Sequence, residues 1–586
     1  MTRKPSIDKP WLKYYTKEAD KPPFAEVTAY QHLYECNKDY LDGIALEYYG
    51  VKISYAMLFE KIDMTAKAFA AQGVKSGDIV TVMMPNTPEV IYCFYALNKI
   101  GACSNMLSPL LTPRHITESI SLTKTNVIIV LDKIFNMLDT VLEKTIAERI
   151  VIVSPLVSLP PVMKLLGSLK SNPPKTPRNG KYISWKKFIE AGKDIKEISQ
   201  AAYKKDTPAT IVYSSGSTGA SKGSVLTNDS FTAFKKITQQ FMEKNNARRG
   251  QSSLGMIPFC YSTGPNSSNH SLCFGITVIL MPIYDEKSFC KHVIKDKPNY
   301  VLATTTFFEA MLKNRAYEKV DLSFLTQVLV AGETLHSNTK KEIDTFLKSH
   351  HAGTRIEKMW GMCEYGSGVT LYSPELENTK NENESVGIPL PHIIVSAFDP
   401  DTDEELSYNE RGEIRVITPC RMLGYYKNPE ATAAFFREGK DGQIWGCSGD
   451  MGYIDEDGNV FIEGRANDYI RGENGNKIWL FDIEKVILTD EAVQLCAAVG
   501  LTAGKGHIPT AHLVLKQDCT EKPEEVIRRV HERCVKSLLS EAVPRRYKIR
   551  GRFNVLPSGK RDTRSLKDER DGFYEVDGNE VREAEV

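Results

Sequence analysis

The sequence has no long apolar run, no C-x-x-C pair, no polybasic arm and no heptad repeat. Its longest apolar stretch, roughly residues 272–283, is too short for a membrane-spanning helix, which needs about 20 apolar residues. The opening residues MTRKPSIDKPWLKYY lack the apolar segment of a signal peptide. We therefore expect a soluble protein of the cytoplasm.

An excess of charge of one sign is also absent, since 75 Lys and Arg stand against 74 Asp and Glu. A nucleic-acid-binding protein would concentrate basic residues on one face, so no nucleic-acid partner is expected. The 12 cysteines are scattered from Cys36 to Cys534, without the spacing of a disulfide framework or a zinc site. Reduced thiols, as in the cytosol, fit this pattern.

The length of 586 residues exceeds what one hydrophobic core supports, so two or more domains are expected. In the first two hundred residues strand-like runs alternate with helix patterns. The run DIVTVMMPN precedes a helix pattern with Thr87 at the N-cap and Pro88 at the first helical position. Further strand-like runs lie at 126–131 and 150–153. This alternation favours an α/β fold with parallel sheets flanked by helices.

The second half of the chain follows a different pattern. Beyond residue 386, short strands and turns continue to about Arg465, which predicts a smaller all-β part. The stretch from about 468 to 586 mixes strands, as at 511–515, with helices, as at 523–539. Its length is that of a small separate α+β domain.

Residues 155–181, PLVSLPPVMKLLGSLKSNPPKTPRNGK, interrupt the α/β alternation with prolines, leucines and lysines. One interpretation is a surface loop whose leucines pack on the domain. The alternative is a peripheral membrane contact, in which three leucines enter the lipid and two lysines meet anionic headgroups. These residues are Leu165, Leu166, Leu169, Lys164 and Lys170.

A stretch rich in glycine and hydroxyl residues, IVYSSGSTGASKGSVLTNDS at 211–230, follows a β-branched apolar run. Glycines let the backbone approach a ligand closely, and free N–H groups, hydroxyls and one ammonium together bind phosphate. A Walker loop is excluded, because Ser221 stands where its second glycine is required. The segment 213–223 is therefore predicted to be a phosphate-binding loop of another kind.

The segment YSSGSTGASKG, at 213–223, resembles the Y-T-S-G-T-T-G-x-P-K-G signature of adenylate-forming enzymes. That family includes acyl-CoA synthetases, nonribosomal adenylation domains and firefly luciferases. The resemblance implies that the loop holds the β- and γ-phosphates of ATP, with Thr218 and Lys222 also acting in catalysis. The implied ATP-binding residues are Ser214, Ser215, Gly216, Ser217, Thr218, Gly219 and Lys222.

Later motifs of the family follow in order. AGET, at 331–334, resembles the segment that lines one side of the adenine, and WGMCEYG, at 360–366, resembles Y-G-x-T-E. The second match implies that Trp360 stacks on adenine and that Glu364 holds Mg²⁺, a hard cation that prefers carboxylate oxygens. Cys363 stands where threonine is usual. The implied nucleotide-site residues are Gly332, Glu333, Thr334, Trp360, Gly361, Met362, Cys363 and Glu364.

The segment WGCSGDMGYIDEDGNVFIEGR resembles the family pair W-x-x-T-G-D…G-R. It implies that Asp450 accepts hydrogen bonds from the ribose hydroxyls and that Arg465 contacts ribose or phosphate. LPSGKRDTRSLK resembles P-x-S-G-K-x-x-x-R and implies that Lys560 of the small domain binds both the attacking carboxylate and the α-phosphate. Five ordered motifs over 213–564 extend the resemblance to nearly the whole chain.

The fold that the resemblance implies has a large N-terminal domain of two flanked sheets plus a small β-barrel-like part. A small, mobile α+β C-terminal domain rotates between the two half-reactions. The implied domains are 1–466 and 467–586, with Asn467 and Asp468, just after Arg465, as hinge candidates.

The acid substrate is indicated by PFCYSTG at 258–264, which matches P-L-F-H-x-x-G and implies that Tyr261 and Gly264 lie near the acyl pocket. KPWLKYY and the segment 105–120 most resemble long-chain fatty acyl-CoA synthetases. The implied activity joins a medium- or long-chain fatty acid to coenzyme A with ATP and Mg²⁺. A carrier-protein-loading ligase, an aryl-CoA ligase and a non-catalytic nucleotide sensor remain alternatives. The oligomeric state stays open, with a homodimer as one candidate.

Overall fold

The computed structural model describes most of the chain. The described residues are 3–19, 21, 24–108, 110–170, 180–213, 222–372, 384–440, 442–472, 476–503, 506–516, 518–554, 562–563, 565–578 and 580–584. Most of the phosphate loop, 214–221, and the expected adenylation lysine Lys560 therefore lie outside the described residues.

The first sheet has eight strands in the order β19-β9-β8-β4-β3-β5-β6-β7. From β8 to β7 all neighbours run parallel, whereas β9 and β19 add antiparallel strands at one edge. The expected strand runs are therefore confirmed. The strands are β3 (Ile79–Met83), β4 (Cys103–Met106), β5 (Val127–Leu131), β6 (Arg149–Val153), β7 (Tyr182–Ser184), β8 (Pro208–Tyr213), β9 (Gly223–Thr227) and β19 (Gly424–Tyr425).

The second sheet has nine strands in the order β16-β15-β14-β13-β12-β10-β11-β1-β2. Its centre is parallel and its two edges are antiparallel. The strands are β1 (Ile44–Tyr48), β2 (Val51–Ser54), β10 (Ser252–Gly255), β11 (Thr277–Leu280), β12 (Tyr300–Ala303), β13 (Gln327–Val330), β14 (Ile356–Gly361), β15 (Gly368–Leu371) and β16 (Ile388–Pro389).

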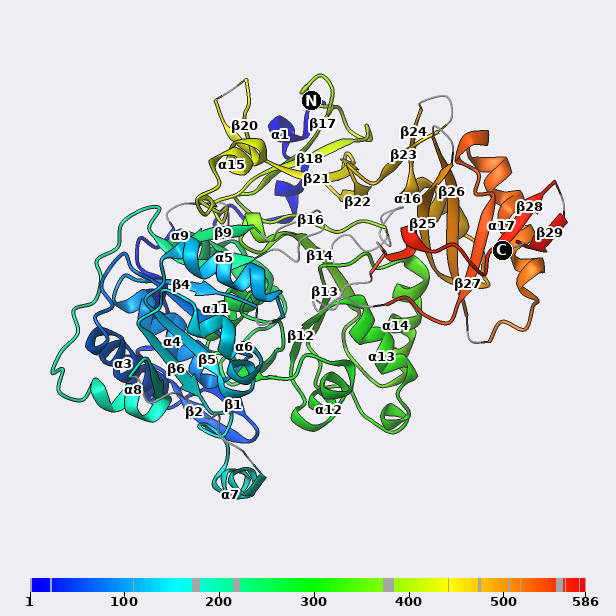
Figure 1. The fold of residues 1–586 in the computed structure, drawn as a ribbon. Helices are drawn as coiled ribbons and strands as arrows, with labels where there is room; N and C mark the ends of the chain where they lie inside the picture. Colours follow the sequence, from blue (N-terminus) through cyan, green and yellow to red (C-terminus); the bar gives the residue numbers. More distant parts are fainter. Residues whose placement is uncertain are drawn as a thin grey trace.

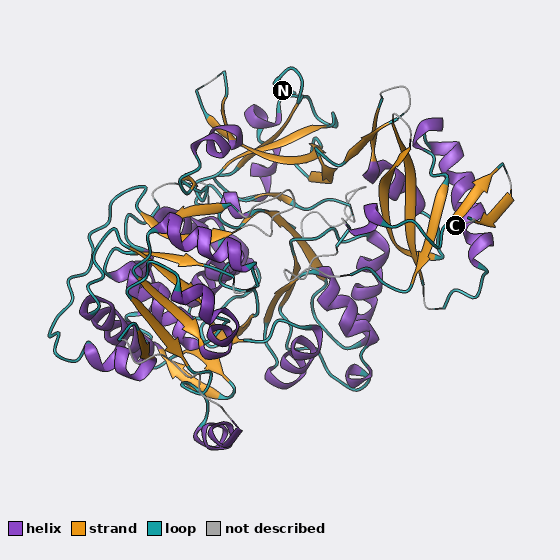
Figure 2. Ribbon diagram, in the orientation of Figure 1, coloured by secondary structure: helices purple, strands orange, loops and turns teal. Residues whose placement is uncertain are grey.

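A shared core joins the two sheets, because one buried cluster contains side chains from β3, from β11 and from helices between them. Helix α4 (Pro88–Lys99) is buried from Pro88 to Asn98, as expected for a helix that is apolar on nearly every side. It begins at Pro88 as predicted, although the Thr87 side chain makes no capping hydrogen bond. Figures 1 and 2 show helices within and around the two sheets.

The outer faces of both sheets are covered by further helices, since α5 and α6 pack on the first sheet and α12 to α14 on the second. This layering confirms the predicted α/β architecture. The remaining helices of this part are α1 (Pro5–Asp8), α2 (Ala29–Asn37), α3 (Tyr55–Ala71), α5 (Pro113–Thr123), α6 (Asp132–Glu143), α8 (Trp185–Ala191), α9 (Asn228–Ile237), α10 (Gln239–Lys244), α11 (Thr263–Cys273), α12 (Glu286–Asp296), α13 (Thr305–Lys313), α14 (Ser337–Ser349) and α15 (Pro429–Phe435).

A five-stranded half-barrel follows, with the order β17-β18-β21-β20 and β22 paired to β21, and it confirms the predicted β-barrel-like part. The last lobe has its own buried cluster, which includes Ile470, Val526 and Tyr547, and Figure 1 shows it beside α14. The division at 466/467 stays a prediction. These strands and helices are β17 (Ile394–Phe398), β18 (Gly412–Ile417), β20 (Phe436–Glu438), β21 (Ile444–Ile454), β22 (Val460–Arg465), β23 (Tyr469–Arg471), β24 (Lys477–Trp479), α16 (Leu480–Ile487), β25 (Val493–Ala503), β26 (Gly506–Leu515), α17 (Pro523–Ser537), β27 (Arg546–Arg550), β28 (Tyr574–Asp577) and β29 (Glu580–Glu583).

Helix α7 (Pro161–Lys170) stands off from the body of the molecule (Figure 1). Leu165 and Leu166 are 65% and 57% exposed, so the interpretation as a loop whose leucines pack on the domain is wrong for these two. The membrane-contact hypothesis stays a prediction, and Leu169 is not described beyond its place in the helix. Across the described residues, no helix has both the length and the apolar character to span a bilayer.

Candidate active site

The candidate site lies where the first sheet, the second sheet and the half-barrel meet. Strand β8 ends at Tyr213, where the phosphate loop begins, and β9 returns from the loop at Gly223. Strand β19 pairs with β9, with Tyr425 opposite Ser224. This pairing places the ring of Tyr425 under Lys222, whose Nζ lies 5.1 Å from the ring centroid, a cation–π distance.

Glu364 follows β14 in a short 3₁₀ turn and is only 5% exposed. Its Oε1 accepts a hydrogen bond of 2.7 Å from the Tyr425 hydroxyl. Burial raises the pKa of the Tyr425 phenol, and the neighbouring carboxylate raises it further, so the phenol remains a donor. A buried carboxylate requires such a partner, and its remaining lone pairs suit a cation.

Two glycines allow the turn around Glu364 to form. A Cβ on Gly361 would lie 2.1 Å from the Ser367 carbonyl oxygen, and Gly366 has φ +79° with the Cys420 carbonyl 2.4 Å from such a Cβ. Neither position accepts a side chain without a shift of backbone. Asn266 of α11 donates to the Gly366 carbonyl at 2.7 Å, which ties this turn to α11.

Trp360 and Asp450 are in direct contact, although they come from different sheets. Trp360 Nε1 donates to Asp450 Oδ2 at 3.0 Å, and Arg465 donates to Asp450 Oδ1 at 2.7 Å and to the Ser448 carbonyl at 3.2 Å. The structure thus brings together three residues that the sequence predicted for the nucleoside. Each carboxylate oxygen keeps a further lone pair for a ribose hydroxyl.

The predicted adenine segment follows β13, the strand next to β14, and so lies near Trp360. Gly332 has φ +85°, which glycine adopts without strain. Glu333 accepts a hydrogen bond of 3.2 Å from Thr306, and the Thr334 carbonyl accepts one of 3.4 Å from Thr305. The segment is therefore held by α13.

Tyr213, at which the phosphate loop begins, is fixed by hydrogen bonds of its hydroxyl and its carbonyl group. The Tyr213 hydroxyl donates to Asn105 Oδ1 at 2.7 Å and lies 2.6 Å from Ser119 Oγ. Cys363 Sγ donates to the Tyr213 carbonyl at 3.8 Å, a weak bond typical of a thiol. Met362 occupies the extended position before the 3₁₀ turn of Glu364.

Tyr261 lies in the turn just before α11, and Gly264 lies in the first turn of that helix. The Gly264 N–H donates to the Tyr261 carbonyl at 2.9 Å, and a Cβ on Gly264 would lie 2.3 Å from the Pro258 carbonyl oxygen. Burial raises the pKa of the Tyr261 phenol, so this side chain is neutral.

The hinge candidates lie in a turn directly after β22. The Asp468 N–H donates to the Arg465 carbonyl at 2.9 Å, and the Asp468 carbonyl accepts from Leu480 at 3.2 Å. Asn467 is exposed. The turn is the covalent link between β22 of the half-barrel and β23 of the last lobe.

A narrow, largely apolar cavity of about 100 Å³ lies between α9, α10, α11 and the second sheet. Three of its lining residues adjoin the site motifs in sequence: Met359 precedes Trp360, Ile257 precedes Pro258, and Ser367 follows Gly366. The cavity is also lined by Phe234, Phe241, Met242, Leu254, Ile276, Val278, Tyr300, Leu329, Leu371, Thr238, Ser268 and His270.

His270, the imidazole that lines this cavity, is uncharged. Burial lowers its pKa to about 3. Thr238 Oγ1 donates to the Phe234 carbonyl at 2.8 Å, so it accepts from His270 Nε2 at 2.8 Å. The proton therefore sits on Nε2, and the cavity presents no formal charge at this residue.

Among family models, the chain matches the AMP-binding enzyme model over residues 33–426. That range is more than half of the 586 residues. The chain belongs to the AMP-binding enzyme family. The predicted membership of the adenylate-forming enzymes is thus confirmed. The prediction that the chain is an ATP-dependent, AMP-forming enzyme is confirmed with it.

This AMP-binding enzyme has relatives among curated proteins and solved structures. It is 27% identical over 574 residues to the long-chain-fatty-acid–CoA ligase of Bacillus subtilis strain 168, covering 96% of this chain and 98% of that one. It is 26% identical over 499 residues to the probable 4-coumarate–CoA ligase 2 of Dictyostelium discoideum, covering 84% and 85%. Its fold matches ATP-bound MatB from Rhodopseudomonas palustris with a TM-score of 0.76 at 20% identity, covering 92% and 98%.

Several residues of this AMP-binding enzyme site were missed by sequence reasoning. Tyr425 stands in the segment GYYKNP at 424–429, to which the sequence assigned no role, and its contacts with Glu364 and Lys222 come from the tertiary structure. Asn266 and the cavity residues gave no signal, because isolated amides and apolar side chains are common in any buried helix or strand. The sequence offered one signal for Tyr425, namely its place between the motif at 360–366 and the motif that contains Asp450.

Proposed function

We propose that this AMP-binding enzyme is an acid–thiol ligase. In the first step a carboxylate oxygen attacks the α-phosphorus of ATP, the bond to the bridging oxygen breaks, and acyl-AMP and pyrophosphate form. In the second step the thiol of coenzyme A attacks the acyl carbon and AMP leaves. The cluster of Lys222, Tyr425 and Glu364 at the return of the phosphate loop is the observation that carries this proposal.

The first step brings two anions together, so the site must neutralise charge and position reactants. Lys222 supplies one positive charge at the return of the phosphate loop, and Tyr425 holds both Lys222 and Glu364 in place. The loop hydroxyls and amides at 214–219, outside the described residues, are proposed to bind the β- and γ-phosphates, with Thr218 in a catalytic position.

Glu364 fits the Mg²⁺ that we propose for this site. Its carboxylate is buried, receives one phenol donor and has acceptor capacity left, and hard cations prefer such oxygens. When bound there, Mg²⁺ would neutralise phosphate charge. Tyr425 then keeps the carboxylate from turning away.

The nucleoside is proposed to lie along Trp360, with its ribose on Asp450. The hydrogen bond from Trp360 Nε1 to Asp450 fixes the plane of the indole, and Arg465 holds the other carboxylate oxygen. An orientated indole suits stacking on a purine. The segment at 332–334 is proposed to close the other side of the adenine.

Lys560, outside the described residues, is proposed to bind the attacking carboxylate and the α-phosphate. We expect Lys560→Ala to abolish acyl-AMP formation and to leave ATP binding largely intact, because the phosphate loop and Asp450 remain. Pyrophosphate release and equilibrium binding of ATP measure the two effects separately. Undiminished pyrophosphate release from this variant would refute the assignment.

The acid is proposed to be a medium- or long-chain fatty acid. The cavity next to Met359 is lined mostly by apolar side chains and carries a neutral His270, so its lining suits methylene groups. Its volume of about 100 Å³ is below the roughly 300–1,000 Å³ of ligand pockets, so a long chain requires the cavity to widen. The B. subtilis relative is named for a long-chain fatty acid, in agreement with this choice. The D. discoideum relative is named for 4-coumarate, so an aryl acid is the second candidate.

The deciding experiment is an ATP–pyrophosphate exchange screen over acetate, octanoate, palmitate, benzoate and coumarate, with AMP release measured with and without coenzyme A. Exchange with octanoate or palmitate and CoA-dependent AMP release are expected. Preference for benzoate or coumarate would favour the aryl ligase, and exchange without CoA-dependent AMP release would favour carrier-protein loading. ATP binding without exchange for any acid would favour a nucleotide sensor.

A further inference from the structure

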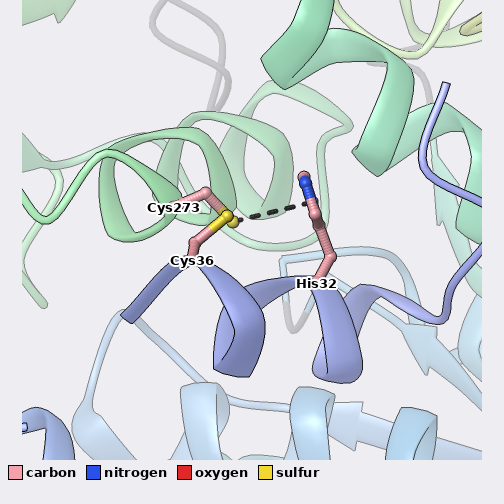
Figure 3. Close-up of side chains that lie close together, drawn as sticks. All are labelled: His32, Cys36 and Cys273. Carbon is pink, nitrogen blue, oxygen red and sulfur yellow. Dashed lines mark hydrogen bonds between the residues drawn. The ribbon is translucent and has the colours of Figure 1, made fainter. Parts of the chain in front are cut away.

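Helices α2 and α11 bring three metal-ligating side chains together away from the adenylation motifs (Figure 3). His32 and Cys36 are four positions apart on α2 and so share one face of that helix. Cys273 is the last residue of α11. Figure 3 shows all three side chains directed into the space between the two helices.

The geometry of the cluster is close to that of a soft metal site. Cys273 Sγ lies 3.9 Å from His32 Nδ1, and the three ligand atoms all lie within 4.8 Å of one another. Bonds of about 2.3 Å from zinc to sulfur and about 2.0 Å to nitrogen separate two ligands of one tetrahedral ion by roughly 3.5–4 Å. Small side-chain movements therefore suffice to bind one ion.

The cluster is largely shielded from water. His32 and Cys273 are buried and Cys36 is half-buried, so water competes for the ligands at one edge only. Asn269 Oδ1, 3.8 Å from Cys273 Sγ, also accepts from the Tyr95 hydroxyl at 2.9 Å.

We propose that His32, Cys36 and Cys273 form a binding site for a thiophilic divalent cation, with Zn²⁺ as its probe. On binding, the two thiols lose their protons to solvent and two sulfur–metal bonds form, with no change of oxidation state. Within the part of the chain that the structure describes, no fourth protein ligand joins this group, so water completes a tetrahedron at the Cys36 edge.

Such an ion would cross-link α2 and α11, because two of its ligands lie on α2 and one lies on α11. Helix α11 also lines the apolar cavity through Ser267, His270 and Ser271, and its first turn carries Gly264. The site is thus a structural metal site that fixes the helix forming one wall of the proposed acyl cavity. None of its three ligands belongs to the predicted adenylation motifs.

The test uses the full-length protein, loaded with Zn²⁺, desalted and analysed for metal by mass spectrometry. We expect one bound zinc per chain and, for Cys36→Ser, an affinity at least about tenfold weaker. Cys519→Ser is the matched control, because Cys519 is also half-buried and lies outside the cluster. Cobalt in place of zinc should give a thiolate-to-metal charge-transfer band that Cys36→Ser weakens.

Cys36→Ser is the primary variant, because the half-exposed position of Cys36 tolerates a hydroxyl. Circular dichroism checks that this variant folds. His32→Gln is the second variant. Equal zinc retention by the parent and both variants would overturn the proposal, as would a cobalt complex without a thiolate band. The proposal would also be overturned if the freshly purified protein retained no zinc and instead contained a disulfide between Cys36 and Cys273. Such a disulfide would be detected by mass and reversed by reductant.

Discussion

Tyr425 makes two contacts with the candidate site through different parts of one side chain. Its ring faces the Lys222 ammonium and its hydroxyl donates to Glu364. The two contacts can therefore be separated by removing the hydroxyl alone.

We expect Tyr425→Phe to slow acyl-AMP formation by about tenfold to a hundredfold, because a hydrogen bond to a charged group contributes about 1.5–3 kcal/mol. The cation–π contact with Lys222 is kept, so the KM for ATP should change little. Initial rates of pyrophosphate release measure both parameters. Tyr426→Phe, one position along and outside this hydrogen bond, is the control, and an equal effect of both variants would contradict the role.

Glu357 on β14 is a buried carboxyl group whose pKa burial raises to about 7. Gln327 donates to it at 3.2 Å. Because the folded pKa lies above the ordinary value near 4.5, the folded state binds more protons between these two pH values. The free energy of unfolding should therefore fall as pH rises from about 4.5 to 7.

Glu357→Gln removes this titration and keeps a partner for Gln327. We expect the variant to be more stable than the parent by about 3 kcal/mol at pH 8, with the advantage lost near pH 5. Urea unfolding at the two pH values measures the difference. The exposed Glu318→Gln is the control, and a gain that is independent of pH would argue against this explanation.

Helix α11 is the element on which most of the site depends. Its first turn carries Gly264, its Asn266 donates to the turn after Glu364, and its middle lines the apolar cavity. A shift of this one helix should therefore alter acid binding more than ATP binding.

Gly264→Ala tests this dependence, because the new Cβ would lie 2.3 Å from the Pro258 carbonyl oxygen. We expect a loss of about 2 kcal/mol in the free energy of unfolding and a KM for the acid that rises several-fold more than that for ATP. Gly353→Ala is the matched control, since no atom lies within 4 Å of its Cβ position and its φ is not positive. An unchanged KM for the acid would show that α11 does not position the acid.

At the scale of the whole molecule, helices lie between two sheets, and the candidate site lies where these sheets meet the half-barrel. The apolar cavity extends into the layer between the sheets. Helix α7 projects from the opposite part of the molecule to the half-barrel in Figure 1. Its exposed leucines make the membrane-contact hypothesis testable without disturbing the core.

We expect the double variant Leu165→Asp, Leu166→Asp to reduce binding to anionic vesicles at least about tenfold, because each leucine would contribute about 1.5–3 kcal/mol when buried in lipid. Co-sedimentation with phosphatidylserine-containing vesicles gives the bound fraction. Leu539→Asp, at an equally exposed leucine of the last lobe, is the control. Binding that is unaffected by the double variant would exclude α7 as the contact.

The α/β architecture, the order of the site motifs and the family follow from the sequence, because these features depend on local chemistry. Buried parallel strands need apolar β-branched runs such as β5, and the turn around Glu364 needs glycine at Gly361 and Gly366. A single chain shows such requirements directly.

Contacts between distant segments were decided only by the tertiary structure. Trp360 meets Asp450 across 90 positions, Tyr425 meets Glu364 across 61, and His32 meets Cys273 across 241. The sequence shows no zinc-ligand spacing, since only two of the three ligands share a helix. Ordinary side chains at these positions carry no local signal, because packing of the sheets and helices alone determines which of them become neighbours.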